Sequence, residues 1–165
     1  MKPTLIKFLL LGVLISGTTT TNLLNAQAIY LKENAELVQE KIEYLNTLLN
    51  DCKLEFKKKT LIAYFYKNGE KYREDRFFME TLDPENVSHS EEEGHVIVRC
   101  RKKMEGKFEK YNNGCIERHF FRDNIRRAYG RTNFDVGSSE EDIDNFERVM
   151  KELIKMGELP HDAHY

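Results

Sequence analysis

The chain has 165 residues, of which 40% are hydrophobic and 33% charged, and its 26 basic and 28 acidic side chains give a formal net charge of −2. This hydrophobic content excludes a disordered chain, and the length is that of one domain. The slightly acidic balance does not favour a nucleic-acid-binding protein, because such proteins usually carry a net basic domain.

The first 26 residues, 1–26, have the pattern of a secretory signal peptide. Two lysines precede an apolar run at 8–15, and the small residues Ala26 and Ala28 provide a cleavage site after either position. A membrane-spanning helix needs about twenty apolar residues, so the shorter run predicts a leader that is removed. We therefore expect a secreted or periplasmic protein that has no membrane association after cleavage.

Residues 27–52 are predicted to form an amphipathic N-terminal helix. Between Leu31 and Cys52 the apolar residues alternate steps of four and three, as in a coiled-coil seam. Further apolar residues at Leu37 and Tyr44 widen this stripe. A strict seam favours a second helix, including a homodimer formed through residues 31–52, whereas a wide stripe favours packing on the sheet of the same chain. Both arrangements remain open.

From residue 53 onward the hydrophobic period changes to that of β-strands. Asn68-Gly69 is a hairpin turn signal, because both central residues of a type I′ turn need positive φ. Residues 107–111 and 115–121 flank the Asn-Asn-Gly turn that precedes Cys115, and 129–136 is the last strand candidate. Turn signals at this spacing predict an α+β fold with an antiparallel meander or partly closed barrel of six or seven strands.

A second amphipathic helix closes the predicted domain, residues 53–157. Ser138 stands three residues before Glu141, so a capping box is available. One apolar face follows at helical spacing, formed by Ile143, Phe146, Val149, Met150, Leu153 and Ile154. Gly157 and Pro160 are expected to end the helix, and residues 158–165 to form a flexible tail.

The three cysteines bear on the compartment. Nearby cysteines of an exported chain tend to pair, so we predict a disulfide between Cys100 and Cys115. It would close a loop of about fifteen residues, a constraint worth about 3 kcal/mol in the chain-entropy model. Cys52 is then left over, either as a small buried group or as a link between two chains.

The charge is unevenly distributed along the chain. Residues 99–131 contain eleven Lys or Arg and four acidic residues, an excess of +7. Such a segment can form an anion-binding face, with Arg101, Lys102, Lys103, Arg126 and Arg127 as its densest positions. The alternative is that these cations lie on solvated strand faces, where they meet acidic residues from elsewhere in the fold.

The sequence contains no signature of a metal, cofactor or nucleotide site. His161 and His164 stand close together, but no further ligand accompanies them, so we expect no metal site and no cofactor. His95 and His119 fall in strand candidates. Either could serve a small enzyme whose site lies in a sheet cavity, provided that a carboxylate or hydroxyl lies within hydrogen-bond reach.

The order of the predicted elements resembles that of pleckstrin-homology-like barrels. The segments that bear the resemblance to such small exported bacterial proteins are Tyr66 to Gly69, Leu82 to Glu85, the strand ending in Cys100, Gly114 to Ile116, and the helix from Phe146 to Ile154. The resemblance implies a barrel plugged by its last helix, and it implies no substrate, since the superfold serves many functions. A cystatin-like or NTF2-like layout is the alternative fold.

These observations favour a non-enzymatic exported module that binds an unknown protein or an anionic ligand. Two alternatives remain. One is a small secreted enzyme with a site in a sheet cavity, and the other is a structural protein that assembles through the helix of residues 31–52.

Overall fold

The structure is a computed structural model, and it describes residues 34–57 and 60–157. The predicted leader and the predicted tail lie outside these residues. The chain divides into two compact units, residues 1–37 and residues 38–165. The arrangement described below is that of the second unit.

The described part combines antiparallel strands with a helix at each end. The first helix is described from residue 34 to residue 48. The elements that follow are β1 (Cys52–Lys57), β2 (Thr60–Lys67), β3 (Glu70–Phe78), the 3₁₀ helix η1 (Met79–Thr81), β4 (Leu82–Ser90), β5 (His95–Cys100), the 3₁₀ helix η2 (Gly106–Tyr111), β6 (Ile116–Phe120), β7 (Ile125–Tyr129), β8 (Arg131–Phe134) and α2 (Glu140–Gly157). The α+β class and the antiparallel strands are therefore confirmed, whereas the count of six or seven strands is too low.

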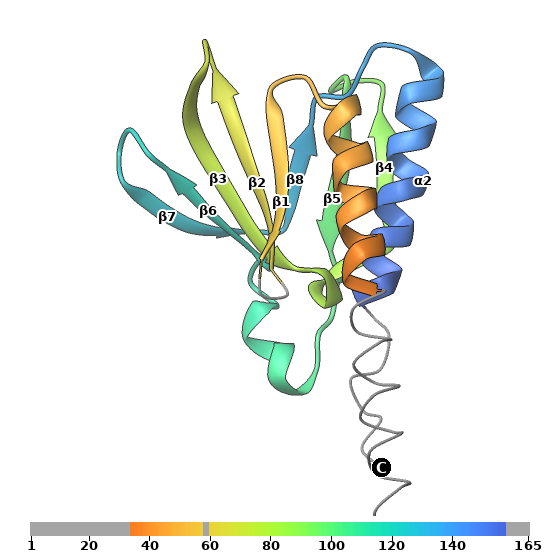
Figure 1. Ribbon diagram of the computed structural model, residues 1–165. Helices are drawn as coiled ribbons and strands as arrows, with labels where there is room; N and C mark the ends of the chain where they lie inside the picture. Colours follow the sequence, from red (N-terminus) through yellow and green to blue (C-terminus); the bar gives the residue numbers. More distant parts are fainter. Residues whose placement is uncertain (1–33, 58–59, 158–165) are drawn as a thin grey trace, which may run out of the picture. The chain divides into compact units, whose positions relative to one another are not determined.

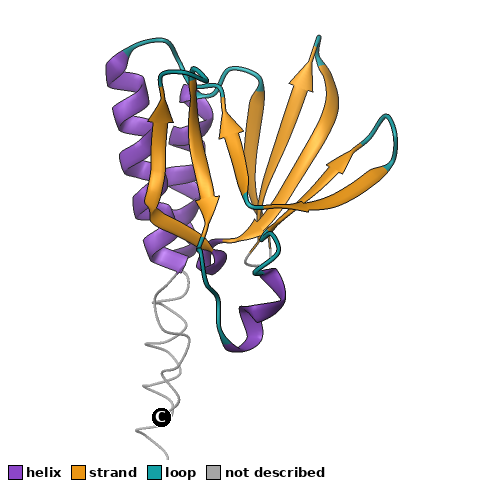
Figure 2. Cartoon of the chain, turned by 180° about the vertical axis from the view of Figure 1, so that it is seen from behind, coloured by secondary structure: helices purple, strands orange, loops and turns teal. Residues whose placement is uncertain are grey.

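The described strands form two sheets. One has the order β1-β2-β3-β6-β7 and the other the order β4-β5-β8, with all pairs antiparallel. An isolated bridge between Leu49 and Val136 links the segments next to β1 and β8. The sheets do not close into one barrel. In Figures 1 and 2 the two long helices lie side by side on one side of the strands.

The predicted last strand, 129–136, is divided in two by the structure. Residues up to Tyr129 pair with β6, whereas Arg131 to Phe134 pair with β5. Gly130 lies at the bend, and its carbonyl accepts a hydrogen bond from the Cys100 N–H at 2.8 Å. The chain thereby passes from the five-stranded sheet to the three-stranded one, so strand β7, which the sequence did not predict, becomes a separate element.

Residues 107–111 are helical, and the prediction of a strand there was wrong. Gly106 adopts φ +58°, which turns the chain sharply before η2. The Asn112 side chain accepts a hydrogen bond from the Met104 N–H (2.7 Å) and donates one to the Met104 carbonyl (3.0 Å). These hydrogen bonds join the two ends of the segment, and its backbone does not pair with a β-strand.

The N-terminal helix ends at residue 48, before the predicted end at residue 52. The Asn46 side chain donates a hydrogen bond to the Leu54 carbonyl (3.0 Å) and accepts one from the Leu54 N–H (2.7 Å). The chain therefore reverses direction into β1, whose first residue is Cys52. Of the predicted seam, Val38, Ile42 and Leu45 are buried in the core of the same chain. Leu37 and Tyr44, on the wider stripe, are exposed.

Helix α2 buries the predicted apolar face. Phe146, Val149, Met150, Leu153 and Ile154 belong to the core, while Ile143 is partly buried against it. The cap lies one residue later than predicted: the Asp142 N–H donates to Ser139 Oγ (3.0 Å), and Ser139 Oγ donates to the Asp142 carboxylate (2.6 Å).

The Asn68-Gly69 turn is confirmed. Asn68 and Gly69 have φ of +54° and +79° and join β2 to β3. The Leu61, Ala63 and Phe65 side chains of β2 are buried, and all three belong to the core cluster. The intervening Ile62 lies on the opposite face of the sheet, because neighbouring residues of a strand point to opposite sides.

Candidate functional site

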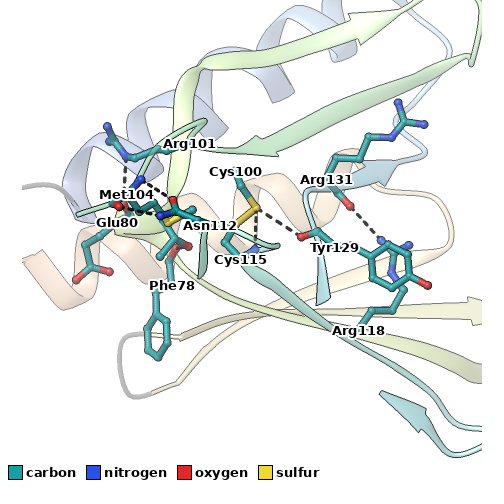
Figure 3. The surroundings of a disulfide bond; sticks show 11 residues. Phe78, Glu80, Cys100, Arg101, Met104, Asn112, Cys115, Arg118, Tyr129 and Arg131 are labelled. Carbon is teal, nitrogen blue, oxygen red and sulfur yellow. Dashed lines mark hydrogen bonds between the residues drawn. A yellow bond between two sulfur atoms is a disulfide. The ribbon is translucent and has the colours of Figure 1, made fainter. Parts of the chain in front are cut away.

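The predicted disulfide joins Cys100 and Cys115, with a Cα–Cα distance of 5.8 Å. Cys100 ends β5 in the three-stranded sheet, and Cys115 directly precedes β6 in the five-stranded sheet. The bond therefore ties the two sheets together and closes the loop that contains η2. Figure 3 shows this bond, with the Cys115 N–H donating to the Cys100 sulfur at 3.1 Å.

Further contacts hold the loop between the two cysteines. The Arg101 N–H donates to the Thr81 carbonyl (3.0 Å), and Arg101 Nε donates to the Glu80 carbonyl (3.1 Å). Met104 is 5% exposed and belongs to the core. In Figure 3 the Asn112 amide lies against the Met104 backbone. Because of these contacts, η2 stands at a defined place beside the five-stranded sheet.

A cavity of about 800 Å³ lies between η2 and the face of the five-stranded sheet that points away from the core. Its apolar lining includes Ile62 and Phe78, together with Tyr111 of η2, whose ring centroid lies 5.9 Å from that of Phe78. This volume falls in the range of small-molecule sites, which are usually apolar with a few placed polar groups.

Three cations and one carboxylate line the same cavity. Lys57 forms an ion pair with Glu55 at 2.6 Å, and this hydrogen bond lowers the pKa of Glu55. Arg76 forms an ion pair with Glu74, which is 6% exposed. The ammonium of Lys110 stands 4.9 Å from the centroid of the Tyr111 ring. The cavity thus offers an apolar floor with an excess of positive charge.

The carboxylate of this lining is Glu117, which forms an exposed ion pair with Arg126 at 2.7 Å. A salt bridge of this kind adds little to stability, at most about 1 kcal/mol. Of the cations that line the cavity, Lys110 stands over an aromatic ring, whereas Lys57 and Arg76 face carboxylates. Lys110 is therefore the cation best placed to meet an anionic group of a ligand.

None of the five basic residues predicted as an anion-binding face lines this cavity. Arg101 is bonded to the backbone of η1, Lys102 and Lys103 are exposed in the loop before η2, and Lys103 forms an ion pair with Glu105 at 3.0 Å. Arg126 and Arg127 are exposed on β7. Two other cations of the basic segment pair with acidic residues outside it, Arg118 with Asp75 and Arg131 with Glu93.

A buried ion-pair network, which the sequence did not indicate, joins the two sheets. Asp75 of β3 is fully buried and accepts two hydrogen bonds from the Arg118 guanidinium, both at 2.8 Å, and one from Thr132 Oγ1 at 2.7 Å. The Arg118 guanidinium also stands 4.2 Å from the centroid of the Tyr129 ring. Asp75 occupies a core-facing position between Arg73 and Phe77, and this alternation was the signal available in the sequence.

Cys52 is a free, buried thiol in this chain. Burial raises its pKa, because a thiolate loses hydration there, while the positive charge of Arg73 acts in the opposite direction. We expect iodoacetamide to alkylate Cys52 in the folded protein at least about a hundredfold more slowly than in guanidinium chloride, because only the thiolate reacts. Mass spectrometry of the modified chain checks this, and rapid alkylation of the native protein would contradict the burial.

The histidines considered as catalytic residues have other contacts. His95 Nδ1 contacts the Glu93 carbonyl, and His119 Nε2 lies 3.1 Å from the Asn124 side-chain oxygen. Within residues 34–57 and 60–157, neither ring has a hydrogen bond to a carboxylate or hydroxyl. His95 lines a cavity of about 400 Å³ together with Asp51 and Asp135, so the small-enzyme alternative stays a prediction. His161 and His164 lie outside the described residues.

Two further searches concern the described residues alone. No group of three or more His, Cys, Asp or Glu side chains in this part of the chain is arranged to hold a metal ion. None of the helices in the described part of the chain is both long and apolar enough to cross a bilayer. Comparisons of the chain with protein-family models, with curated proteins and with solved structures found no match.

Proposed function

We propose that this protein is an exported, non-enzymatic binding module that takes a ligand with an apolar part and an anionic group. The cavity of about 800 Å³ between η2 and the five-stranded sheet is the observation on which this proposal rests. Its floor supplies apolar contact, and Lys110 supplies positive charge, since Lys57 and Arg76 are paired with Glu55 and Glu74. A concave, mostly apolar surface with a few convergent polar groups is the usual form of a ligand site.

Export is part of the proposal. The predicted leader lies outside the described residues, so its support is the sequence pattern of residues 1–26. The Cys100–Cys115 disulfide supports an oxidising compartment, since cytosolic thiols are mostly kept reduced. The resemblance to pleckstrin-homology-like barrels also remains a proposal, supported by antiparallel strands followed by one C-terminal helix.

The cavity is tested with a fluorescent probe that has the proposed chemistry, 1-anilinonaphthalene-8-sulfonate. We expect saturable binding to the folded protein, and weaker binding of the uncharged analogue N-phenyl-1-naphthylamine. Lys110→Gln should raise the dissociation constant of the sulfonate about fivefold, the effect of one exposed charge contact of about 1 kcal/mol. Ala128→Phe, which adds a ring to the lining, should abolish binding. Fluorescence titration measures all of these effects.

Lys102→Gln is the matched control, because it removes the same charge from the same disulfide loop without touching the cavity lining. It should leave the dissociation constant of the sulfonate unchanged. If Lys102→Gln weakens binding as much as Lys110→Gln, the anionic group is held by the loop that the sequence singled out and not by the cavity. Binding that survives Ala128→Phe would remove the cavity as the site.

A further inference from the structure

The buried network around Asp75 holds two guanidinium groups and one carboxylate. Both Asp75 oxygens accept hydrogen bonds from Arg118, and Oδ2 also accepts one from Thr132. Arg73 Nε lies 3.4 Å from Asp75 Oδ1 as an ion pair. The Arg73 and Arg118 side chains are only 14% and 12% exposed. The charges of Arg118 and Asp75 therefore neutralise each other, and the positive charge of Arg73 exceeds the negative charge of this network.

Arg73 has hydrogen-bond donors that the described residues leave unused. A guanidinium carries five N–H groups, and the hydrogen bond described for Arg73 runs from Nη2 to Thr132 Oγ1 at 3.4 Å. Its Nε is buried without a hydrogen-bond partner. Burial also lowers the pKa of the Arg73 guanidinium. The Nε faces Asp75 Oδ1 at 3.4 Å, so the donors left for a ligand are among the other N–H groups of the guanidinium.

A second cavity, of about 400 Å³, adjoins Arg73. The register of β2 and β3 shifts here: Phe65 pairs with Arg73 and Tyr66 with Lys71, which leaves Tyr72 as an extra residue. Phe65, Tyr66, Tyr72 and Arg73 all line the cavity. The Arg73 guanidinium stands 3.5 Å from the centroid of the Phe65 ring. Bulges often redirect side chains next to functional sites, and this one places Arg73 at the cavity.

We propose that this second cavity binds a small zwitterionic carboxylate, a molecule of the amino-acid class, with Arg73 holding the carboxylate. Lys67 and Asn133 line the same cavity and add donors. Asp51 and Asp135 also line it; their negative charge repels dianions and suits an amino group of the ligand. The site is separate from the cavity beside η2, so it stands or falls independently of the function proposed above.

The first test compares two variants that remove one guanidinium each, in buffer without small carboxylates. Arg118→Met leaves Asp75 without its bidentate partner and should lower the folding equilibrium constant roughly a hundredfold or more. Arg73→Met removes the excess charge and should change that constant less than about fivefold, because Asp75 keeps Arg118. Urea unfolding measures both. An equal loss for the two variants would place Arg73 within a balanced network and overturn the proposal.

The second test uses glycine, acetate and inorganic phosphate as probes of the full-length mature protein. Glycine at about 50 mM should raise the urea midpoint, since a ligand that binds the folded state stabilises it. Acetate should act more weakly, and phosphate not at all. Arg73→Met should abolish the response to glycine. Phosphate acting more strongly than glycine, no response to glycine, or a response retained in Arg73→Met would each overturn the assignment.

Discussion

Replacing Asp75 with Asn is expected to lower the free energy of unfolding by about 3–5 kcal/mol, the cost of removing one partner from a buried ion pair. The substitution keeps the size of the side chain but leaves the charges of Arg73 and Arg118 buried without a counter-charge. Thr132 also loses its carboxylate acceptor. Urea unfolding followed by circular dichroism measures the change. Such a loss is a large fraction of the stability of a small domain.

Glu117→Gln is the control for this prediction. It also removes a carboxylate from an arginine pair, on the neighbouring strand, but Glu117 and Arg126 are both more than half exposed. We expect a change of at most about 1 kcal/mol. Similar losses for Asp75→Asn and Glu117→Gln would mean that the Asp75 network is not the buried junction between the two sheets.

The second large effect concerns the disulfide. The Cys100→Ala, Cys115→Ala double variant is expected to lose about 3 kcal/mol of stability, the value for a loop of about fifteen residues. The unfolded chain gains conformational freedom when the cross-link is absent, and the two sheets lose their covalent tie. Reduction of the wild-type protein with dithiothreitol should lower its urea midpoint as far as the double substitution does. The double variant should not respond to the reductant.

Cys52→Ala tests whether the third cysteine contributes to the response of the urea midpoint to dithiothreitol. Cys52 is buried and unpaired, so the variant should retain the full response to dithiothreitol. A wild-type midpoint that dithiothreitol leaves unchanged would show that the hydrogen bonds of Arg101 and Asn112 are enough to hold the loop. Loss of the response in Cys52→Ala would instead point to a disulfide that involves Cys52.

Features that depend on a few neighbouring residues were predictable. The Asn68-Gly69 turn follows from the positive φ that both positions need. The apolar face of α2 follows from helical spacing, and five of its six residues are buried. The Cys100–Cys115 pair follows from proximity in the chain together with the expected compartment. The cap of α2 was misplaced by one residue because Ser138 and Ser139 both present a hydroxyl in front of acidic residues.

Other features depend on residues far apart in the sequence, and no local pattern could indicate which of these residues meet. Asp75 meets Arg118 and Thr132 at separations of 43 and 57 residues. The cavity beside η2 exists because residues 106–111 form a helix and not the predicted strand. The basic residues predicted as one face are shared between a loop and β7, because η2 and β6 lie between residues 101–103 and Arg126 and Arg127.

The sequence by itself determined the α+β class, the antiparallel strands, the amphipathic helices and the pairing of two cysteines, because each depends on side-chain periodicity or on short separations along the chain. Only the tertiary structure decided which strands share a sheet, where the charges of Asp75, Arg73 and Arg118 are buried, and where the two cavities lie. Burial and electrostatic pairing depend on distances in space, and those distances are set when the sheets pack together.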